Sequence, residues 1–211
     1  VYVCNSSGGM ILLGLTGGIA SGKSTVNKMF ELPMIDLDVI SREIFVPGHS
    51  AYKKTVAEFG RDILNEDGTI NRKKLGAIIF NDAAQRKKLN KITHPAIFTS
   101  MVKQILWHFI IGTKILLIDS PLLFESKLSK WMRHTIVVYV PPDLQLERLI
   151  GRDESTPEEA QQRIDSQMSL DKKKELATFL IDNSGTLEET QTQVNALRDK
   201  LIKSTYWFRK Q

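Results

Sequence analysis

The sequence predicts an α/β fold, a five-stranded parallel sheet with helices on both faces. Five short apolar segments alternate with helical stretches, which is typical of a parallel sheet that is covered on both sides. The first apolar segment runs directly into a glycine-rich loop, the arrangement of a phosphate-binding strand, loop and helix. With 211 residues, 42% hydrophobic and 25% charged, the chain is long enough to bury one substantial core. The predicted strands are residues 11–15, 34–37, 115–119, 135–140 and 178–181.

The glycine-rich loop has the P-loop pattern G-x4-G-K-S. Glycines let backbone N–H groups come close to phosphate oxygens, Lys23 adds a positive charge, and the Ser24 hydroxyl is suited to Mg²⁺. The following helix directs its positive end at the same phosphates. We therefore expect a bound nucleoside triphosphate with Mg²⁺, and a Lys23 side chain that faces solvent without it. The predicted nucleotide-binding residues are Gly17, Gly18, Ile19, Ala20, Ser21, Gly22, Lys23, Ser24 and Thr25.

Helical patterns fill the segments between the strands. Residues 50–111 contain no predicted strand and predict a helical insert after the second strand. Residues 152–156 are a polar elbow between two helices, which predicts a hinged, arginine-bearing lid over about residues 148–167. Residues 10–211 then form a single domain, and residues 1–9 are expected to be an extraneous or unstructured leader. The predicted helices are residues 38–45, 51–59, 71–80, 83–91, 95–111, 143–151, a segment from Thr156 with its cap, and 187–202 with Thr186 as cap.

Charge and cysteine usage limit the classes of protein. The net charge is +5, but the basic triplets at 72–74, 86–88 and 172–174 are dispersed among acidic residues, which favours solvated helix faces over a nucleic-acid site. The single cysteine, Cys4, excludes an intrachain disulfide and favours a reducing compartment, cytoplasmic or mitochondrial. The four histidines lack metal-ligand spacing, and no apolar run is long enough for a membrane span, so we expect a soluble protein.

A kinase acting on a small molecule needs a carboxylate near the acceptor hydroxyl and arginines near the transferred phosphoryl group. Asp36 and Asp38 lie at the carboxyl end of the second predicted strand, where open α/β sheets place ligand-binding groups. Asp38 is either the base, which we favour, or a helix cap. Arg148 and Arg152 share a helix face, which is either a phosphate-binding or a solvated surface. A GTPase is disfavoured because the sequence has no N-K-x-D motif.

These segments, in this order, resemble the dephospho-CoA kinase family, and in particular its single-domain animal-type members. The resemblance implies ATP- and Mg²⁺-dependent transfer of the γ-phosphoryl group to the ribose 3′-hydroxyl of dephospho-CoA, the last step of coenzyme A synthesis. It extends from residue 10 to about residue 196. It rests on residues 14–25, 35–42, 46–48, 93–95, 120–125, 145–149 with 152–153, 163–167 and 181–185.

The resemblance also implies a fold and a set of roles. The fold is the P-loop nucleoside-triphosphate-hydrolase fold of nucleotide-kinase type, with strand order 2-3-1-4-5, a helical CoA-binding insert and a lid. Asp38 matches the family's candidate base, Arg148 its phosphate-stabilising arginine, and Arg152 a lid partner, while Lys23 completes the predicted catalytic set. Residues expected to line the acceptor pocket are Arg42, His94, Leu122 and Glu125.

Two positions depart from the family pattern. Asp119 stands where the family has an apolar residue, and we interpret it as a water-mediated contact to Mg²⁺. The connection between Phe30 and Ile35 is about three residues shorter than usual, which shifts Asp38 relative to Lys23. A nucleoside or nucleotide kinase and a non-catalytic nucleotide-binding protein are the alternatives to a dephospho-CoA kinase. Neither a nucleic-acid partner nor a membrane span is expected.

Overall fold

The computed structural model describes residues 9–80 and 82–207, so the predicted leader lies, apart from residue 9, outside the described residues. The described chain divides into two compact units. The sheet unit holds the residues up to Ile35 and from His108 onward, and the helical unit spans Asp36–Trp107. The helical unit thus begins earlier than the insert expected from residue 50.

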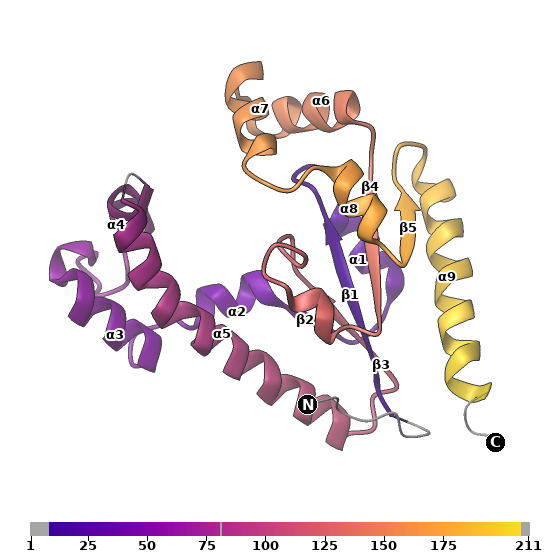
Figure 1. The fold of residues 1–211 in the computed structure, drawn as a ribbon, viewed down its shortest axis with the longest axis horizontal. Helices are drawn as coiled ribbons and strands as arrows, with labels where there is room; N and C mark the ends of the chain where they lie inside the picture. Colours follow the sequence, from indigo (N-terminus) through magenta and orange to yellow (C-terminus); the bar gives the residue numbers. More distant parts are fainter. Residues whose placement is uncertain (1–8, 81, 208–211) are drawn as a thin grey trace. The chain divides into compact units, whose positions relative to one another are not determined.

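The sheet unit is built on five strands in the order β2-β3-β1-β4-β5 (Figure 1). The central strand β1 (Ile11–Gly17) pairs in parallel with β3 (Ile115–Asp119) on one side and with β4 (His134–Tyr139) on the other. On the outer side of β4 lies β5 (Phe179–Asp182), and β2 (Met34–Asp36) forms the opposite edge. All five predicted strands are present with ends displaced by at most two residues, which confirms the predicted fold class and the implied strand order.

Helices cover both faces of this sheet, which explains why its strands are apolar along their whole length. On one face, α1 (Lys23–Phe30) buries Val26 and Phe30 against Leu13 and Leu15 of β1. On the same face, α9 (Leu187–Trp207) adds Val194 to this core and lies beside β5 in Figure 1. The core therefore fixes where β1 ends and α1 begins, which is where the phosphate-binding loop lies.

The opposite face is covered by α8 (Leu170–Leu176), whose Leu170 packs against Val137 and Val140. It connects to a pair of helices, α6 (Pro142–Asp153) and α7 (Pro157–Asp165), which are joined by the predicted polar elbow. Thr156 and Glu159 form a reciprocal capping box that starts α7 sharply after this elbow.

In the helical unit, α2 (Leu37–Glu43), α3 (Ser50–Phe59), the short helix η1 (Arg61–Ile63), α4 (Arg72–Phe80) and α5 follow one another. Ile63, Ile70, Leu75 and Leu89 form its core. The prediction of two helices at 83–91 and 95–111 is wrong, because α5 (Ala83–Ile110) is continuous with Pro95 inside it. Proline removes the N–H that would reach the carbonyl of residue 91, but Lys91 and Pro95 are both exposed, so water can satisfy that carbonyl.

Among the helices of the described residues, none is both long and apolar enough to span a membrane.

Candidate active site

The phosphate-binding loop occupies residues 18–22, between the last residue of β1 and the first residue of α1. Its backbone has positive φ angles at Ala20 (60°) and Gly22 (83°), so the chain turns through the left-handed region twice. At Gly22 a Cβ atom would also lie 2.0 Å from the side-chain nitrogen of Asn183. The glycine is therefore required by neighbouring protein atoms as well as by the expected approach of phosphate.

Three side chains from distant segments hold this loop. Gln145 donates to the carbonyl of Ile19 at 2.8 Å, and Gln167 accepts from the N–H of the same residue at 3.2 Å. Asn183 donates to the carbonyl of Ser21 at 2.9 Å. None of these three side chains has a role predicted from the sequence, although all three lie within the segments that carry the family resemblance. Together they fix the conformation of the loop through protein contacts alone.

Arg148, the predicted phosphate-stabilising arginine, lies beside one of these tethers. Its guanidinium donates to the backbone carbonyl of Asn183 at 2.9 Å. The Asn183 side chain in turn accepts from the hydroxyl of Thr190 at 3.0 Å. A guanidinium has five N–H donors, so this one bond leaves donors for an anion. The structure thus brings Arg148 next to a residue that supports the P-loop.

Lys23 does not face solvent, and that prediction is wrong. Its side chain is 15% exposed and its ammonium forms an ion pair with the carboxylate of Asp119, at the end of β3. The other oxygen of Asp119 accepts from the amide of Asn27 at 2.8 Å. Asp119 is only 3% exposed, and a buried carboxylate requires a cation or donors, which explains the inward position of Lys23.

A second lysine lies behind the loop. The triplet 172–174 was predicted to be a solvated face, which is wrong for Lys173, a fully buried residue. It follows Leu170 by three positions on α8, so both side chains face the sheet. The Lys173 ammonium pairs with Glu125 at 3.1 Å. Burial lowers the pKa of Lys173. The Glu125 carboxylate raises this pKa in part, and repulsion from the Lys23 ammonium lowers it further.

The elbow arginine Arg152 is held by its neighbour in the chain. It donates two hydrogen bonds to Asp153, at 2.7 and 3.0 Å, and Arg163 of α7 pairs with the same carboxylate. The two guanidinium groups hold the pKa of Asp153 well below its usual range. Arg148 and Arg152 therefore lie one turn apart on α6 with different partners, and Asp153 joins α6 to α7.

Asp36, the last residue of β2, and Asp38, in the first turn of α2, have separate positions. Asp36 caps α2, because its carboxylate accepts from the backbone N–H groups of Asp38 and Val39 at 2.8 and 3.1 Å. The alternative of Asp38 as the cap is therefore wrong, since the helix begins one residue earlier than predicted. Asp38 lies exposed in the first turn, and within the described ranges no hydrogen bond to its carboxylate is present.

The predicted acceptor-binding residues are spread over several elements. Arg42 is exposed in the last turn of α2, and His94 is exposed within α5. In the sheet unit, Leu122 is 45% exposed in the turn after β3, and Glu125 of that turn accepts from the N–H of Met168 at 3.2 Å as well as pairing with Lys173.

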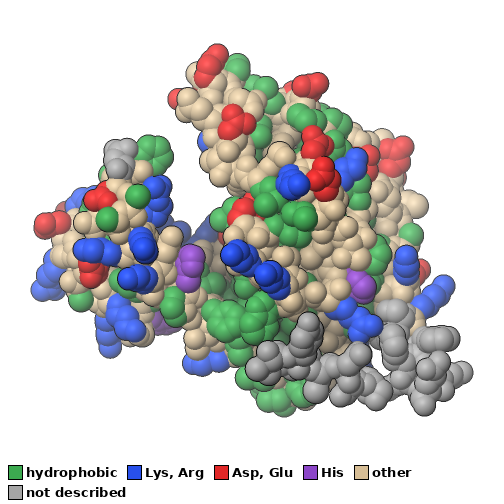
Figure 2. Space-filling view, viewed as in Figure 1, with side chains coloured by type: hydrophobic (Ala, Val, Ile, Leu, Met, Phe, Trp, Pro, Cys, Tyr) green, Lys and Arg blue, Asp and Glu red, His purple; other side chains and the backbone are tan. Residues whose placement is uncertain are grey.

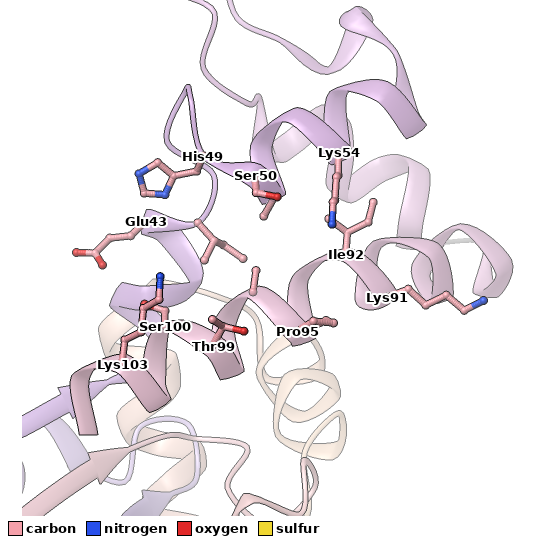
Figure 3. A pocket seen from close by; sticks show the side chains of 13 residues that line it. Glu43, His49, Ser50, Lys54, Lys91, Ile92, Pro95, Thr99, Ser100 and Lys103 are labelled. Carbon is pink, nitrogen blue, oxygen red and sulfur yellow. The ribbon is translucent and has the colours of Figure 1, made fainter. Parts of the chain in front are cut away.

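A groove of about 460 Å³ lies within the helical unit, between α2, α3 and α5 (Figure 3). In this view Lys54 points from α3 toward α5, and Lys91 points away from the groove. The basic triplets at 72–74 and 86–88 do not line it, nor do Arg42 and His94. Its lining comprises Glu43, Ile44, His49, Ser50, Ala51, Lys54, Lys91, Ile92, Pro95, Ala96, Thr99, Ser100 and Lys103.

Basic and acidic side chains are interspersed on the visible face of the helical unit (Figure 2). Lys88 of the second basic triplet forms a surface ion pair with Glu58 at 2.8 Å, which raises its pKa. This part of the surface agrees with the prediction of solvated helix faces.

The strand order, the P-loop between β1 and α1 and the arginine-bearing helices after β4 define a P-loop kinase of nucleotide-kinase type. A family model described as dephospho-CoA kinase matches residues 11–189. The chain belongs to the dephospho-CoA kinase family, and it is a kinase of coenzyme A biosynthesis.

Individual relatives agree with this assignment. A zebrafish (Danio rerio) dephospho-CoA kinase domain-containing protein is 48% identical over 91% of this chain and 86% of its own length. A Bacillus cereus dephospho-CoA kinase is 46% identical over 90% of this chain and 96% of its own. The solved structure of dephospho-CoA kinase from Campylobacter jejuni superposes with a TM-score of 0.70 at 28% identity, covering 92% of this chain and 98% of that one.

Proposed function

We propose that this protein transfers the γ-phosphoryl group of ATP to the ribose 3′-hydroxyl of dephospho-CoA, which yields coenzyme A and ADP. The observation that carries the proposal is the P-loop itself. It is held by Gln145, Gln167 and Asn183 in a triphosphate-ready conformation, in a chain that matches dephospho-CoA kinases over most of its length. A loop organised before binding does not lose conformational freedom when the phosphates bind.

The residues of the sheet unit fit a nucleotide with Mg²⁺. Ser24 is exposed in the first turn of α1, and the Asp119 carboxylate next to Lys23 would supply a second oxygen near the ion. Mg²⁺ is commonly held by one or two protein oxygens together with water and phosphate oxygens, so this donor set suits it. The ion would neutralise part of the charge on the β- and γ-phosphates. In the nucleotide complex Lys23 exchanges Asp119 for a phosphate oxygen.

The transfer itself uses Asp38 and the two arginines of α6. The acceptor oxygen attacks the γ-phosphorus, its proton passes to the carboxylate of Asp38, and the bond to the β-phosphate oxygen breaks as ADP leaves. Arg148 and Arg152 donate to the equatorial oxygens of the phosphoryl group, whose charge is greatest in the transition state. Arg152 leaves Asp153 for this purpose when the lid closes.

The helical unit supplies a place for the long arm of the acceptor. Its groove combines the apolar side chains of Ile92 and Pro95 with the ammonium groups of Lys54 and Lys103. Apolar surface suits the pantetheine chain, and the lysines suit the diphosphate. Arg42, His94 and Leu122 complete the proposed acceptor contacts, whereas the Glu125 carboxylate is engaged by Lys173 and by the N–H of Met168.

The proposed setting is a soluble protein that acts on small molecules in a reducing compartment, cytoplasmic or mitochondrial, without a nucleic-acid partner. The single cysteine and the dispersed basic triplets support this setting.

The test is ATP consumption with dephospho-CoA, compared with adenosine, AMP and shikimate as acceptors, together with identification of the product by mass. We expect turnover with dephospho-CoA and a product of the mass of coenzyme A. Faster turnover with adenosine or AMP would replace the proposal by a nucleoside or nucleotide kinase. No turnover with any acceptor, while ATP still binds, would favour a non-catalytic nucleotide-binding protein.

A further inference from the structure

Lys173 has three oxygen atoms around its ammonium group. It lies 2.6 Å from the carbonyl oxygen of Pro121, 3.1 Å from the carboxylate of Glu125, and 3.4 Å from the carbonyl oxygen of Gly17. An ammonium group has three N–H donors, so each oxygen can receive one. The three acceptors belong to two segments, the end of β1 and the turn after β3. A side chain of α8 thus joins two segments of the candidate site.

Burying an ammonium group is unfavourable unless an anion accompanies it. Lys173 is 0% exposed, and Glu125 supplies the negative charge. Glu125 also accepts from the N–H of Met168, which ties the turn after β3 to the segment before α8. A buried lysine that held only the fold together would be replaceable by an apolar side chain of similar length. The hydrogen bonds to the carbonyls of Gly17 and Pro121 need a donor at this position, which an apolar side chain lacks.

The arrangement mirrors that of Lys23. Each lysine pairs with a carboxylate: Lys23 with Asp119 at the end of β3, and Lys173 with Glu125 in the turn that follows β3. Lys23 leaves its carboxylate to bind phosphate in the proposed reaction. Lys173 is enclosed by protein and already has three acceptors, so it remains in place.

We infer that Lys173 is a positioning residue for phosphoryl transfer, which sets the P-loop at a fixed distance from the turn at residues 121–125. It contacts no substrate and acts through the carbonyls of Gly17 and Pro121. The inference rests on the proposed function, in which this turn lines the acceptor pocket. Because a misplacement of about 1 Å can lower a reaction rate by about 10²-fold, loss of Lys173 lowers kcat more than it lowers substrate affinity.

The experiment compares Lys173→Met with the parental protein and with Lys172→Met. Lys172 is a matched control, since it precedes Lys173 on the same helix and forms a surface pair with Glu175. For Lys173→Met we expect kcat with dephospho-CoA to fall at least about tenfold, while Kd for ATP changes less than about threefold. Lys172→Met keeps the parental values. A parental kcat in Lys173→Met overturns the inference.

A second variant separates positioning from stability. Lys173→Met leaves the Glu125 carboxylate without its cation, so Tm falls, and Lys173→Met/Glu125→Gln removes both charges. We expect this double variant to regain Tm without regaining kcat. Recovery of both would show that Lys173 acts only on stability and would overturn the inference.

Hydrogen exchange on the ligand-free proteins gives a measurement that does not depend on activity. In Lys173→Met we expect faster exchange in peptides covering residues 17–22 and 121–126, and parental exchange in β4. If the parental protein does not phosphorylate dephospho-CoA, the proposed function fails by itself. The hydrogen-exchange rates then test the positioning role of Lys173 by themselves, because unchanged rates in both peptides would contradict that role.

Discussion

The sheet unit and the helical unit hold their candidate functional side chains in opposite ways. In the sheet unit, buried or half-buried side chains such as Gln145 and Asn183 bond to the P-loop backbone, and Lys23 and Lys173 both pair with carboxylates. In the helical unit, Asp38 and the lysines beside the groove are exposed. The P-loop of the sheet unit is therefore tethered by protein side chains, whereas these charged groups of the helical unit are solvated.

Under the proposed function, the physical reason lies in the kind of ligand that each unit would bind. A triphosphate is recognised largely by backbone N–H groups, which must all converge, so the loop needs a fixed conformation. A long flexible acceptor is held by a groove with a few charges, and lysine side chains can adjust to it. Substitution of the paired lysines in the sheet unit should therefore lower both turnover and stability. Substitution of Asp38 or of the groove lysines in the helical unit should change turnover or acceptor affinity without a loss of stability.

The largest effect is expected at Lys23. Lys23→Ala removes a cation from the transition state, which lowers kcat by about 10²-fold or more, equivalent to about 3 kcal/mol. It also leaves the buried Asp119 without its ion pair, so Tm falls as well. Lys23→Ala/Asp119→Asn regains Tm but not turnover, and Lys28→Ala, at an exposed position on the same helix, changes neither. Near-parental turnover of Lys23→Ala at saturating ATP would show that the P-loop does not take part in catalysis.

Asp38 should show a loss of turnover without a loss of stability. Asn cannot accept the hydroxyl proton, so Asp38→Asn lowers kcat by about 10²-fold. Its exposed carboxylate caps no helix, so thermal unfolding stays parental. The neighbouring Asp36→Ala removes the cap of α2 and lowers stability by about 1 kcal/mol. A loss of kcat in Asp36→Asn but not in Asp38→Asn would show that Asp36, and not Asp38, is the base.

Arg148→Ala and Arg152→Ala test whether the lid acts on the transition state. We expect kcat to fall about tenfold in each, equivalent to about 1.4 kcal/mol, with little change in the Kd for ATP. Arg198→Ala is the control, because Arg198, on α9, pairs with Glu31 at the end of α1 and not with a residue of the elbow. If ATP affinity fell tenfold with unchanged kcat, the arginines would be ground-state contacts.

The smallest effect is expected at the groove. Lys54→Ala and Lys103→Ala each remove one solvated charge, worth about 0.5 to 1 kcal/mol, so the KM for dephospho-CoA rises about threefold while kcat is unchanged. The effect shrinks as salt is added, because exposed charges are screened. Lys53→Ala, next to Lys54 but outside the groove, keeps the parental KM. An unchanged KM in both groove variants would place the acceptor elsewhere.

The sheet and the P-loop could be predicted from sequence because apolar runs and a fixed glycine spacing report local geometry. The partners of Lys23 and Lys173 could not, since each ion pair joins segments far apart in the chain. Lys173 illustrates the difficulty, because three consecutive lysines suggest a solvated face, and only the packing of Leu170 on Val137 turns the middle one inward. Pro95 led to the prediction of two helices in place of one. The helix tolerates this proline because it is exposed, and its exposure depends on how the unit folds.

Hydrogen exchange with and without dephospho-CoA tests the contrast between the two units most directly. We expect protection concentrated in the helical unit, around the groove of α3 and α5, with further protection near residues 148–156 when a non-hydrolysable ATP analogue is added. AMP alone should protect the groove little. Protection confined to the P-loop, or equal protection of the groove by AMP, would contradict the claim that the helical unit recognises the acceptor.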